Sequence, residues 1–213
     1  MDLKNDSKNQ HFLSQAEQRL NALNPAAKER NQRIYEFDLI DRERYFLKLK
    51  SDRGVVIGNT LSLHDLFSFD VLGSSFERYN FEKLFQGYES QNRILTQDLL
   101  RKVGTQGADI GKEVVNLFLV KFLNFLRNPY SVKKILNTFP PLLSICPTDP
   151  IHLDNFNRVL KGRKPHQRHL CAKLDISEDE YIVWLSVIFL LLTPLGKADE
   201  DFLSEMVKGL FES

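Results

Sequence analysis

The sequence predicts an α+β fold that is mostly α, with a small N-terminal antiparallel β meander packed on a helical bundle. Three observations lead to this prediction. Apolar and polar residues alternate over residues 34–39 and 45–49, which is typical of half-buried strands. Apolar residues recur at helical spacing over residues 80–103 and 111–126. A further apolar run, residues 181–195, is too short for a membrane span and predicts a buried helix.

The composition is that of an ordinary globular protein and excludes collagen-like, low-complexity and disordered classes. The 213 residues include 16 Phe but one Trp and two Met, so we expect a core of large rings and leucines. The chain has 29 Lys and Arg against 28 Asp and Glu, a net charge of +1. No global field therefore attracts nucleic acid or an anionic membrane. Two cysteines, Cys146 and Cys171, are too few for a disulfide scaffold, which predicts a reducing, cytoplasmic location.

The N-terminal part contains one predicted helix and the predicted meander. The helix runs from about Ser14 to Leu23 and ends at Asn24, because a residue before proline avoids the helical conformation. The strands are residues 34–39, in which Tyr35, Phe37 and Leu39 alternate with acidic residues, then 45–49 and 54–58. An isolated hairpin is only marginally stable in water, so we expect the meander to pack on the helices.

From about residue 61 the pattern becomes helical. Leu63, Leu66 and Phe67 fit a single helical turn. The segment 111–126 is apolar on nearly every side, which predicts the central buried helix. A short helix is expected at 131–137, and the prolines between 139 and 150 indicate a loop.

The C-terminal part predicts two further helices. Ser177 and Glu180 form the sequence pattern of a capping box, which begins a helix that reaches about Thr193. The last helix is amphipathic and covers about residues 199–211. Its apolar stripe includes Phe202, Met206 and Phe211.

Strong catalytic motifs are missing from the sequence. It has no phosphate-binding loop of the GxxxxGK type and no GxGxxG, GxSxG, HExxH or paired CxxC motif. This argues against the best-marked nucleotide-binding, dehydrogenase, hydrolase and zinc classes. No metal site is predicted, although His166, His169 and Cys171 are close enough in sequence to supply three zinc ligands.

The segment around residues 161–168 is strongly basic. One interpretation is a solvated surface loop, and the other is a site that binds phosphate groups. The candidate substrate-binding residues of this segment are Arg163, Lys164 and Arg168.

Three separate residues are candidates for chemistry. His11 can act as a general base or metal ligand near neutral pH, or can simply lie at the edge of the fold. Glu89 lies beside an apolar helical stripe, and Arg127 ends the apolar helix 111–126. We expect an acid and a guanidinium in these positions to form an ion pair. The pair would either belong to a functional site or fix the register of two helices.

Several short motifs occur in an order that resembles a known family. They are Gln10-His11-Phe12, the Ile34-Tyr35 strand, Tyr88-Glu89-Ser90 and Arg127-Asn128-Pro129. The pattern resembles a bacterial family defined as a domain of unknown function, whose members carry Gln-His-Tyr/Phe, Glu-Ser and Arg-x-Pro motifs. The match covers about residues 8–135. The family residues that carry over are Gln10, His11, Glu89, Arg127 and Pro129.

Members of that family occur in phage-defence loci on mobile elements, so the resemblance implies an anti-phage or toxin-type role. A nuclease or another enzyme acting on nucleotides fits this role. His11 would be the base or a metal ligand, Glu89 a metal ligand or acid–base partner, and Arg127 a phosphate clamp. Gln10 would contact the substrate. The cofactor stays open, with a divalent metal as one option.

The alternative function is a non-catalytic interaction protein. Its C-terminal helices would bind a phage or host protein or form a homodimer; no membrane partner is expected. The chain divides into a family-like region, residues 1–135, and a C-terminal helical region, residues 136–213. Family members continue with a β-rich segment and a Ser-Asp-x-Pro motif, for which Thr148-Asp149-Pro150 is the nearest match. The chain is accordingly a shortened relative, a fragment, or a family region joined to a separate helical module.

Overall fold

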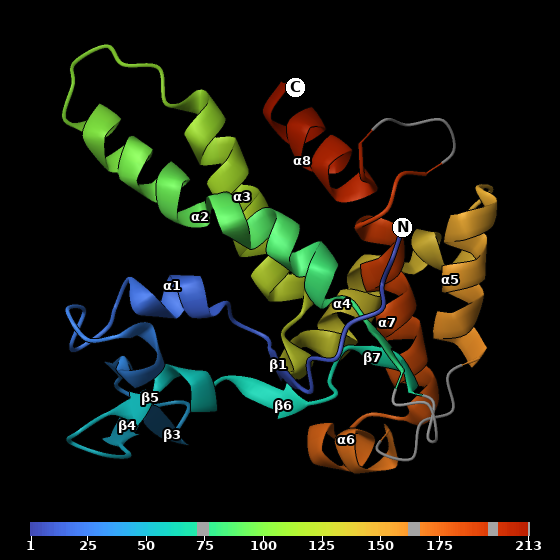
Figure 1. Ribbon diagram of the computed structural model, residues 1–213, viewed down its shortest axis with the longest axis horizontal. Helices are drawn as coiled ribbons and strands as arrows, with labels where there is room; N and C mark the ends of the chain where they lie inside the picture. Colours follow the sequence, from blue (N-terminus) through green and yellow to red (C-terminus); the bar gives the residue numbers. More distant parts are fainter. Residues whose placement is uncertain (72–76, 162–166, 196–199, 213) are drawn as a thin grey trace. The chain divides into compact units, whose positions relative to one another are not determined.

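The computed structural model describes residues 1–71, 77–161, 167–195 and 200–212. The fold is α+β and mostly α, which confirms the predicted class (Figure 1). The chain forms two compact units. Unit 1 consists of Met1–Gln10 and His64–Ser213, and unit 2 of His11–Leu63. These limits differ from the expected division near residue 135, because helices from both sides of that position pack together in unit 1.

Unit 1 contains most of the helices. The predicted helices at 80–103, 111–126, 131–137, 177–193 and 199–211 are confirmed to within a few residues. They are α2 (Glu82–Val103), α3 (Gly111–Leu126), α4 (Val132–Thr138), α7 (Glu178–Leu191) and α8 (Phe202–Glu212), with the 3-10 turns η3 (Pro129–Ser131) and η4 (Pro140–Ser144).

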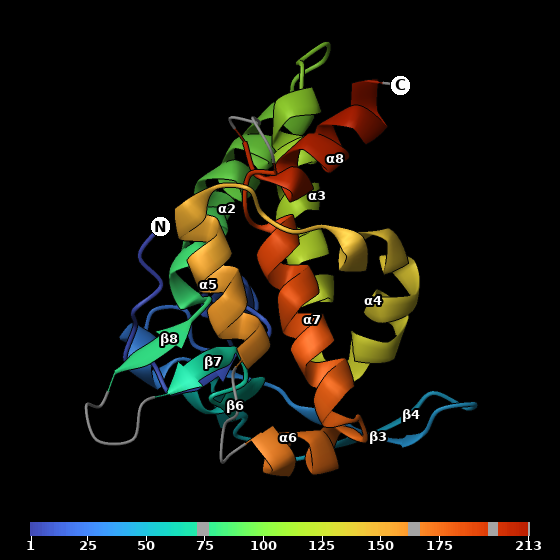
Figure 2. The same cartoon turned by 90° about the vertical axis from the view of Figure 1, so that its right-hand side faces the viewer.

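The central element of unit 1 is α7, which lies between α4 and α5 (Pro150–Lys161) (Figure 2). Its side chains from Trp184 to Leu191 are almost completely buried. The prediction that 111–126 is the most buried helix is wrong, since Val114 and Phe118 of α3 are exposed. The difference follows from charge: α7 has no charged residue after Glu180, whereas α3 carries Lys112, Glu113 and Lys121.

The capping box of α7 is confirmed. The Ser177 hydroxyl accepts a hydrogen bond from the Glu180 backbone N–H at 3.0 Å, and the Glu180 carboxylate accepts one from the Ser177 N–H at 2.7 Å. These two bonds satisfy backbone donors that an uncapped helix leaves unpaired. The capping box therefore makes Ser177 the N-cap of α7, the most buried helix.

Large rings from several elements meet against α7, as the Phe-rich composition predicts. The Phe67 ring centre is 4.8 Å from that of Phe85 and 5.7 Å from that of Trp184. Phe81 lies 6.3 Å from Phe189 of α7 by the same measure. All five residues are at most 1% exposed. Rings of this size bury much area per residue and dominate the stability of a core.

The segment after residue 61 is extended, so the predicted helical turn at Leu63–Phe67 is wrong. It contains β6 (Ser62–His64) and β7 (Ser68–Val71), and β7 pairs antiparallel with β8 (Arg78–Asn80). Asp65 has a positive φ of 55°, which a helix does not admit. Its carboxylate accepts hydrogen bonds from the Ser68 hydroxyl at 2.9 Å and from Arg78 Nε at 2.8 Å. This polar network stabilises a tight turn in place of a helix.

Aromatic and cationic side chains link the strands of unit 1 to a helix. The Arg158 guanidinium carbon of α5 lies 4.9 Å from the ring centre of Tyr79 in β8. Arg158 also forms an ion pair with Asp70 of β7 at 3.3 Å. These contacts place α5 against the β7–β8 hairpin.

Two helices of unit 1 were not expected from the sequence, α5 and α6 (Gln167–Leu174). The Thr148-Asp149-Pro150 stretch is a helix start, since Asp149 Oδ1 accepts from the backbone N–H groups of Ile151 and His152 at 3.0 and 2.9 Å. Residues 167–171, expected as part of a basic loop, lie in α6. No helix within the described ranges is both long and apolar enough to cross a membrane.

Unit 2 is built from short elements. Two of the three predicted strands pair as an antiparallel hairpin, in which Phe37 lies opposite Leu49 and Leu39 opposite Leu47. The third, expected at 54–58, does not extend the hairpin into a meander, because its short strand pairs with residues 33–34 instead and residues 57–59 form a 3-10 turn. The predicted helix 14–23 ends early at Arg19, because Leu23 N donates to Arg33 O at 2.9 Å. The elements are β1 (Asn9–His11, which begins in unit 1), α1 (Gln15–Arg19), η1 (Glu29–Asn31), β2 (Arg33–Ile34), β3 (Phe37–Asp41), β4 (Phe46–Leu49), β5 (Val55–Val56, antiparallel to β2) and η2 (Ile57–Asn59).

The buried hydroxyl of Tyr181 provides a test of the core. It donates to the Leu66 carbonyl at 2.7 Å, and both residues are fully buried. Tyr181→Phe leaves that carbonyl without its donor and should lower the free energy of unfolding by about 1–3 kcal/mol. Tyr45→Phe, at a position 83% exposed, should change it by less than about 0.5 kcal/mol. Urea denaturation measures both, and equal effects would contradict the assigned bond.

Candidate functional site

The structure brings Glu89 and Arg127 together in unit 1. Arg127 is the C-terminal cap of α3, and its Nη1 forms an ion pair with Glu89 Oε1 of α2. The Arg127 side chain is 2% exposed and that of Glu89 is 23% exposed. Arg127 Nη2 donates to Asn124 Oδ1 at 2.8 Å, and the guanidinium carbon lies 5.2 Å from the Phe85 ring centre. The guanidinium is therefore paired, hydrogen-bonded and stacked inside the protein.

A second carboxylate, Glu82, belongs to the same site. Glu82, Phe85 and Glu89 have a spacing of three and seven residues, which places them on one face of α2. Burial raises the pKa of Glu82 from 4.5 to about 7; the Arg127 charge opposes this rise and the Glu89 charge adds to it. Two buried polar atoms of the cluster, Glu82 Oε1 and Arg127 Nε, have no hydrogen-bond partner within the described part of the chain.

The sequence analysis did not single out Glu82. The signal was present, since Glu82 precedes Glu89 by seven residues in the most strongly periodic helix. Two positions so spaced share a helix face, about 10 Å apart along the axis.

The geometry of this cluster allows a carboxyl group to act as a general acid or base, but it does not suit phosphate binding by Arg127. A carboxyl group that titrates near pH 7 can give or accept a proton, as a general acid or base must. The Arg127 guanidinium is enclosed by protein and its charge is met by Glu89. That environment suits an ion pair that sets the register of α2 and α3, and it offers no open surface to a phosphate group.

The other motif residues of the predicted site have structural surroundings of their own. Gln10 is fully buried, its amide donates to Ser7 O at 3.0 Å and to Ser68 Oγ at 2.9 Å, and its carbonyl oxygen accepts from the Phe67 N–H. Gln10 therefore stabilises the interior of unit 1, and its expected contact with substrate stays a prediction. Pro129 is buried in η3, directly after the Asn128 side chain caps that turn.

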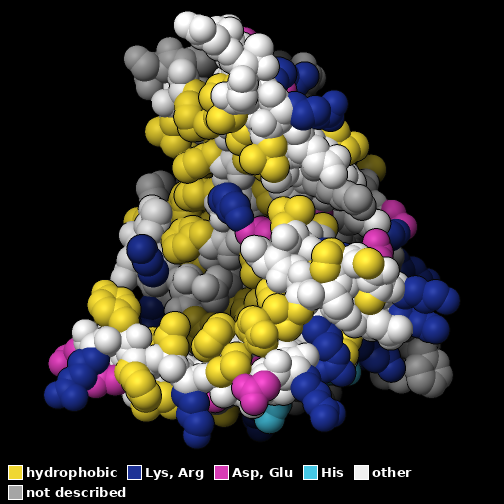
Figure 3. Space-filling model, turned by 90° about the vertical axis from the view of Figure 1, so that its left-hand side faces the viewer, with side chains coloured by type: hydrophobic (Ala, Val, Ile, Leu, Met, Phe, Trp, Pro, Cys, Tyr) yellow, Lys and Arg dark blue, Asp and Glu magenta, His cyan; other side chains and the backbone are white. Residues whose placement is uncertain are grey.

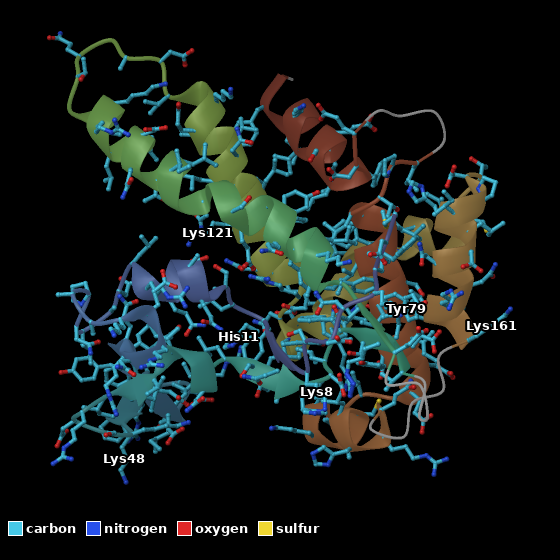
Figure 4. The ribbon with its side chains drawn as sticks, in the orientation of Figure 1. Lys8, His11, Lys48, Tyr79, Lys121 and Lys161 are labelled. Carbon is cyan, nitrogen blue, oxygen red and sulfur yellow. The ribbon has the colours of Figure 1, made fainter. Side chains whose placement is uncertain are left out.

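His11 belongs to unit 2, where it precedes α1 (Figure 4). Its Nε2 lies 2.9 Å from Gln15 Nε2. Its participation in one site with Glu89 and Arg127 stays a prediction.

The predicted basic site is described only in part. Arg163, Lys164 and His166 lie outside the described residues. Arg168 begins the exposed side of α6 and forms an ion pair with Glu178 at 3.1 Å. Cys171 is 5% exposed and burial raises the pKa of its thiol. No group of three His, Cys, Asp or Glu residues suited to a metal ion occurs among the side chains that the structure describes.

Comparisons with known proteins do not assign a function. The chain matches no family model, no curated protein and no solved structure. The resemblance to the defence-locus family thus remains a prediction from its short motifs.

The Glu89–Arg127 pair predicts unequal effects of removing either partner. Glu89→Met leaves a buried guanidinium uncompensated and should cost about 3 kcal/mol of unfolding free energy. Arg127→Met should cost less, because the partly exposed Glu89 carboxylate can be hydrated. The double variant should be more stable than the sum of the single effects implies, by at least about 1 kcal/mol. Urea denaturation of the four proteins measures this, and strict additivity would show that the pair has no energetic coupling.

The raised pKa of Glu82 predicts a pH-dependent stability. Between pH 4.5 and about 7 the folded state binds this proton more tightly than the unfolded state does, so stability falls as pH rises through that window. Glu82→Gln removes the effect, and its stability relative to wild type should improve by up to about 3 kcal/mol between about pH 5 and about pH 8. Glu205→Gln, at an exposed position of α8, is the control. Parallel stability–pH curves for wild type and Glu82→Gln would contradict the assignment.

Proposed function

We propose that this chain is a binding protein and that unit 2 presents the surface covered by a partner protein. The observation that carries the proposal is the exposed apolar face of the β3–β4 hairpin. Phe37 and Leu39 of β3 are 50% and 53% exposed, and Leu47, opposite Leu39, is 53% exposed. The alternating pattern predicts a strand with one buried face, yet this face is open. Figure 3 shows hydrophobic side chains, in yellow, among polar and charged ones on the face that this view presents.

The opposite face of the hairpin is polar and internally paired. Asp38 lies across from Lys48. Lys50 forms ion pairs with Glu36 and with Asp38, the latter at 3.3 Å. The hairpin is therefore amphipathic. Charged side chains on one face pair with one another, whereas the apolar side chains on the other face are exposed. Such an arrangement is typical of a surface that binds another molecule.

The interior of unit 2 is too small to supply much stability by itself. Ile57 is the one buried hydrophobic residue of residues 11–63, all of which the structure describes. Its other buried side chains are polar: Ser14, Gln18, Gln32 and Thr60. Small domains with little buried apolar area depend on further contacts for stability. A partner that covers the apolar face of the hairpin would supply them.

The charge of the hairpin region favours a protein partner. Residues 33–56 carry six basic and five acidic side chains, so no positive field attracts nucleic acid or an anionic membrane. The tip adds Tyr45 and Phe46, which are 83% and 59% exposed. Exposed aromatic residues beside aliphatic ones mark protein–protein interfaces. The resemblance to the defence-locus family makes a phage or host protein the expected partner, in an anti-phage or toxin-type role.

The C-terminal helix is a weaker candidate for this surface than the hairpin. Leu203 and Val207 of α8 are fully buried in unit 1, so part of its apolar stripe closes the core. Phe211 is half exposed, with its ring centre 5.6 Å from that of Phe118.

A second candidate function is an enzyme acting on nucleic acid or nucleotides, and the pKa of Glu82 favours it. A carboxyl group with a pKa of about 7 beside Glu89 can serve as a general acid or base. The test is purified protein incubated with DNA, RNA and nucleoside triphosphates, with and without Mg²⁺ or Mn²⁺. Activity that Glu82→Gln abolishes supports the enzyme, and no turnover under any of these conditions excludes it.

Site-specific photocrosslinking in infected cells tests the binding function. A photoreactive phenylalanine analogue at Leu39 or Leu47 should give a discrete covalent adduct with one other protein, because both positions lie on the apolar face. The same analogue at Asp38 or Lys48, on the opposite face of the same strands, is the matched control and should give little adduct. All four positions lie in exposed strands, so these substitutions should change the unfolding free energy by less than about 0.5 kcal/mol. Equal adducts from both faces, or none from either, would contradict the proposal.

A further inference from the structure

The β3–β4 hairpin of unit 2 has two open strand edges. Within the described part of the chain, these two strands form a sheet of their own, with no third strand beside them. Every residue of β4 except Leu49 is exposed. A strand at the edge of a sheet presents backbone N–H and C=O groups that can pair with another chain. The direction of these groups therefore decides what the hairpin can bind.

The register of the hairpin shows which backbone groups point outward. The Lys50 N–H donates to the Glu36 carbonyl at 2.9 Å, so these two residues form a hydrogen-bonded pair. Hydrogen-bonded and non-hydrogen-bonded pairs alternate along an antiparallel ladder. The next pair, Phe37 with Leu49, is therefore of the non-hydrogen-bonded kind, and so is the pair two residues further along. Leu47 and Leu49 of β4 consequently direct their N–H and C=O groups away from β3.

Of the two edges, β4 is the better suited to an added strand. It is regular from Phe46 to Leu49, whereas a bulge interrupts β3 between Leu39 and Asp41. Bulges are one of the features by which proteins block pairing at a strand edge. The side chains of Leu47 and Leu49 also lie on the apolar face of the hairpin. An added strand would gain main-chain hydrogen bonds and apolar contacts from the same two residues.

Lys48 determines which charge the added strand should carry. It lies between the two leucines, so its side chain is on the polar face. It is exposed and makes no ion pair with any residue that the structure describes. Asp38, across from it in β3, pairs with Lys50 instead. In a cross-strand pair, an opposite charge is stabilising and a like charge is destabilising. An acidic side chain opposite Lys48 would therefore favour the pairing.

The same lysine argues against a second copy of this chain as the occupant. If two β4 strands paired antiparallel through their outward groups, Leu47 of each would lie opposite Leu49 of the other. Lys48 would then lie directly opposite Lys48 of the second copy, and this like-charge pair is destabilising. A lysine in the middle of an exposed edge strand commonly protects a protein from self-association in this way.

We propose that β4 binds an extended segment of the partner protein by strand addition. Two apolar residues of that segment pair with Leu47 and Leu49, and an acidic residue between them lies opposite Lys48. Main-chain hydrogen bonds supply affinity in this mode of recognition, and the alternating side chains supply specificity. The inference rests on the proposed function of unit 2 and specifies how the partner is held.

A short peptide tests the backbone pairing on the full-length protein. The probe is acetyl-Thr-Val-Glu-Val-Thr-amide. With its Glu opposite Lys48, both Val residues exchange hydrogen bonds with Leu47 and Leu49. Titration followed by ¹H–¹⁵N NMR should show saturable shifts at the backbone amides of these two leucines. N-methylation of both Val nitrogens removes the donors that face β4 and should weaken binding about tenfold.

The matched control peptide is methylated at the nitrogens of Glu and of the C-terminal Thr. These two groups face away from β4, so this peptide should bind like the unmodified one. Equal binding of the two methylated peptides, or no saturable binding of the unmodified peptide, would overturn strand addition. A crosslinked adduct from Leu39 or Leu47 would in that case still support the partner protein, so the two proposals fail separately.

A reversal of charge tests the role of Lys48. The wild type should prefer the Glu peptide about fivefold over the same peptide with Lys in place of Glu. Lys48→Glu should reverse this preference. Lys28→Glu, at an exposed position of unit 2 outside the hairpin, is the control and should keep it. For the same reason, a photoreactive analogue at Lys48 removes the charge that favours the added strand, so that position should still give less adduct than Leu47.

Two results of these measurements would overturn the assignment of the occupant. One is an unchanged preference for the Glu peptide in Lys48→Glu. The other is a shift of the Leu47 and Leu49 amides on dilution of the protein without peptide, which would show that a second copy of the chain occupies the edge.

Discussion

The burial of large apolar side chains in this molecule is concentrated around α7, and the rest of the structure follows from that distribution. Rings from the turn before β7, from the start of α2 and from α7 itself meet in unit 1. Unit 2 keeps Ile57 as its buried hydrophobic residue. Because folding stability derives mainly from buried apolar area, the two units differ in what they can support alone. That difference is the physical basis for assigning partner binding to unit 2.

The titratable groups in the interior of unit 1 are either paired or held in their uncharged form. Arg127 has a carboxylate, an amide and an aromatic ring around it, whereas Glu82 stays protonated up to about pH 7 because burial disfavours its ionised form. Both arrangements arise from one face of α2.

The sequence predicted the elements whose signals are local. The periodicity of α2 and α3, the capping box at Ser177 and the alternation in β3 and β4 all correspond to observed elements. The pairing of Glu89 with Arg127 was also foreseen. The turn at Asp65 was missed because a carboxylate network with Ser68 and Arg78 forms it, and such contacts have no periodicity. Glu82 was missed because its burial depends on how the helices pack.

The central claim is that the interior of unit 2 in the unbound protein is less stable than the interior of unit 1. Native-state hydrogen exchange on the full chain tests it directly, by comparing the backbone amides of Asp38 and Lys48 with those of Leu185 and Ile188 in α7. The account predicts that the hairpin amides exchange through local opening at a free energy several kcal/mol below that of the α7 amides, which should exchange only on global unfolding. Equal opening free energies in the two regions would contradict it.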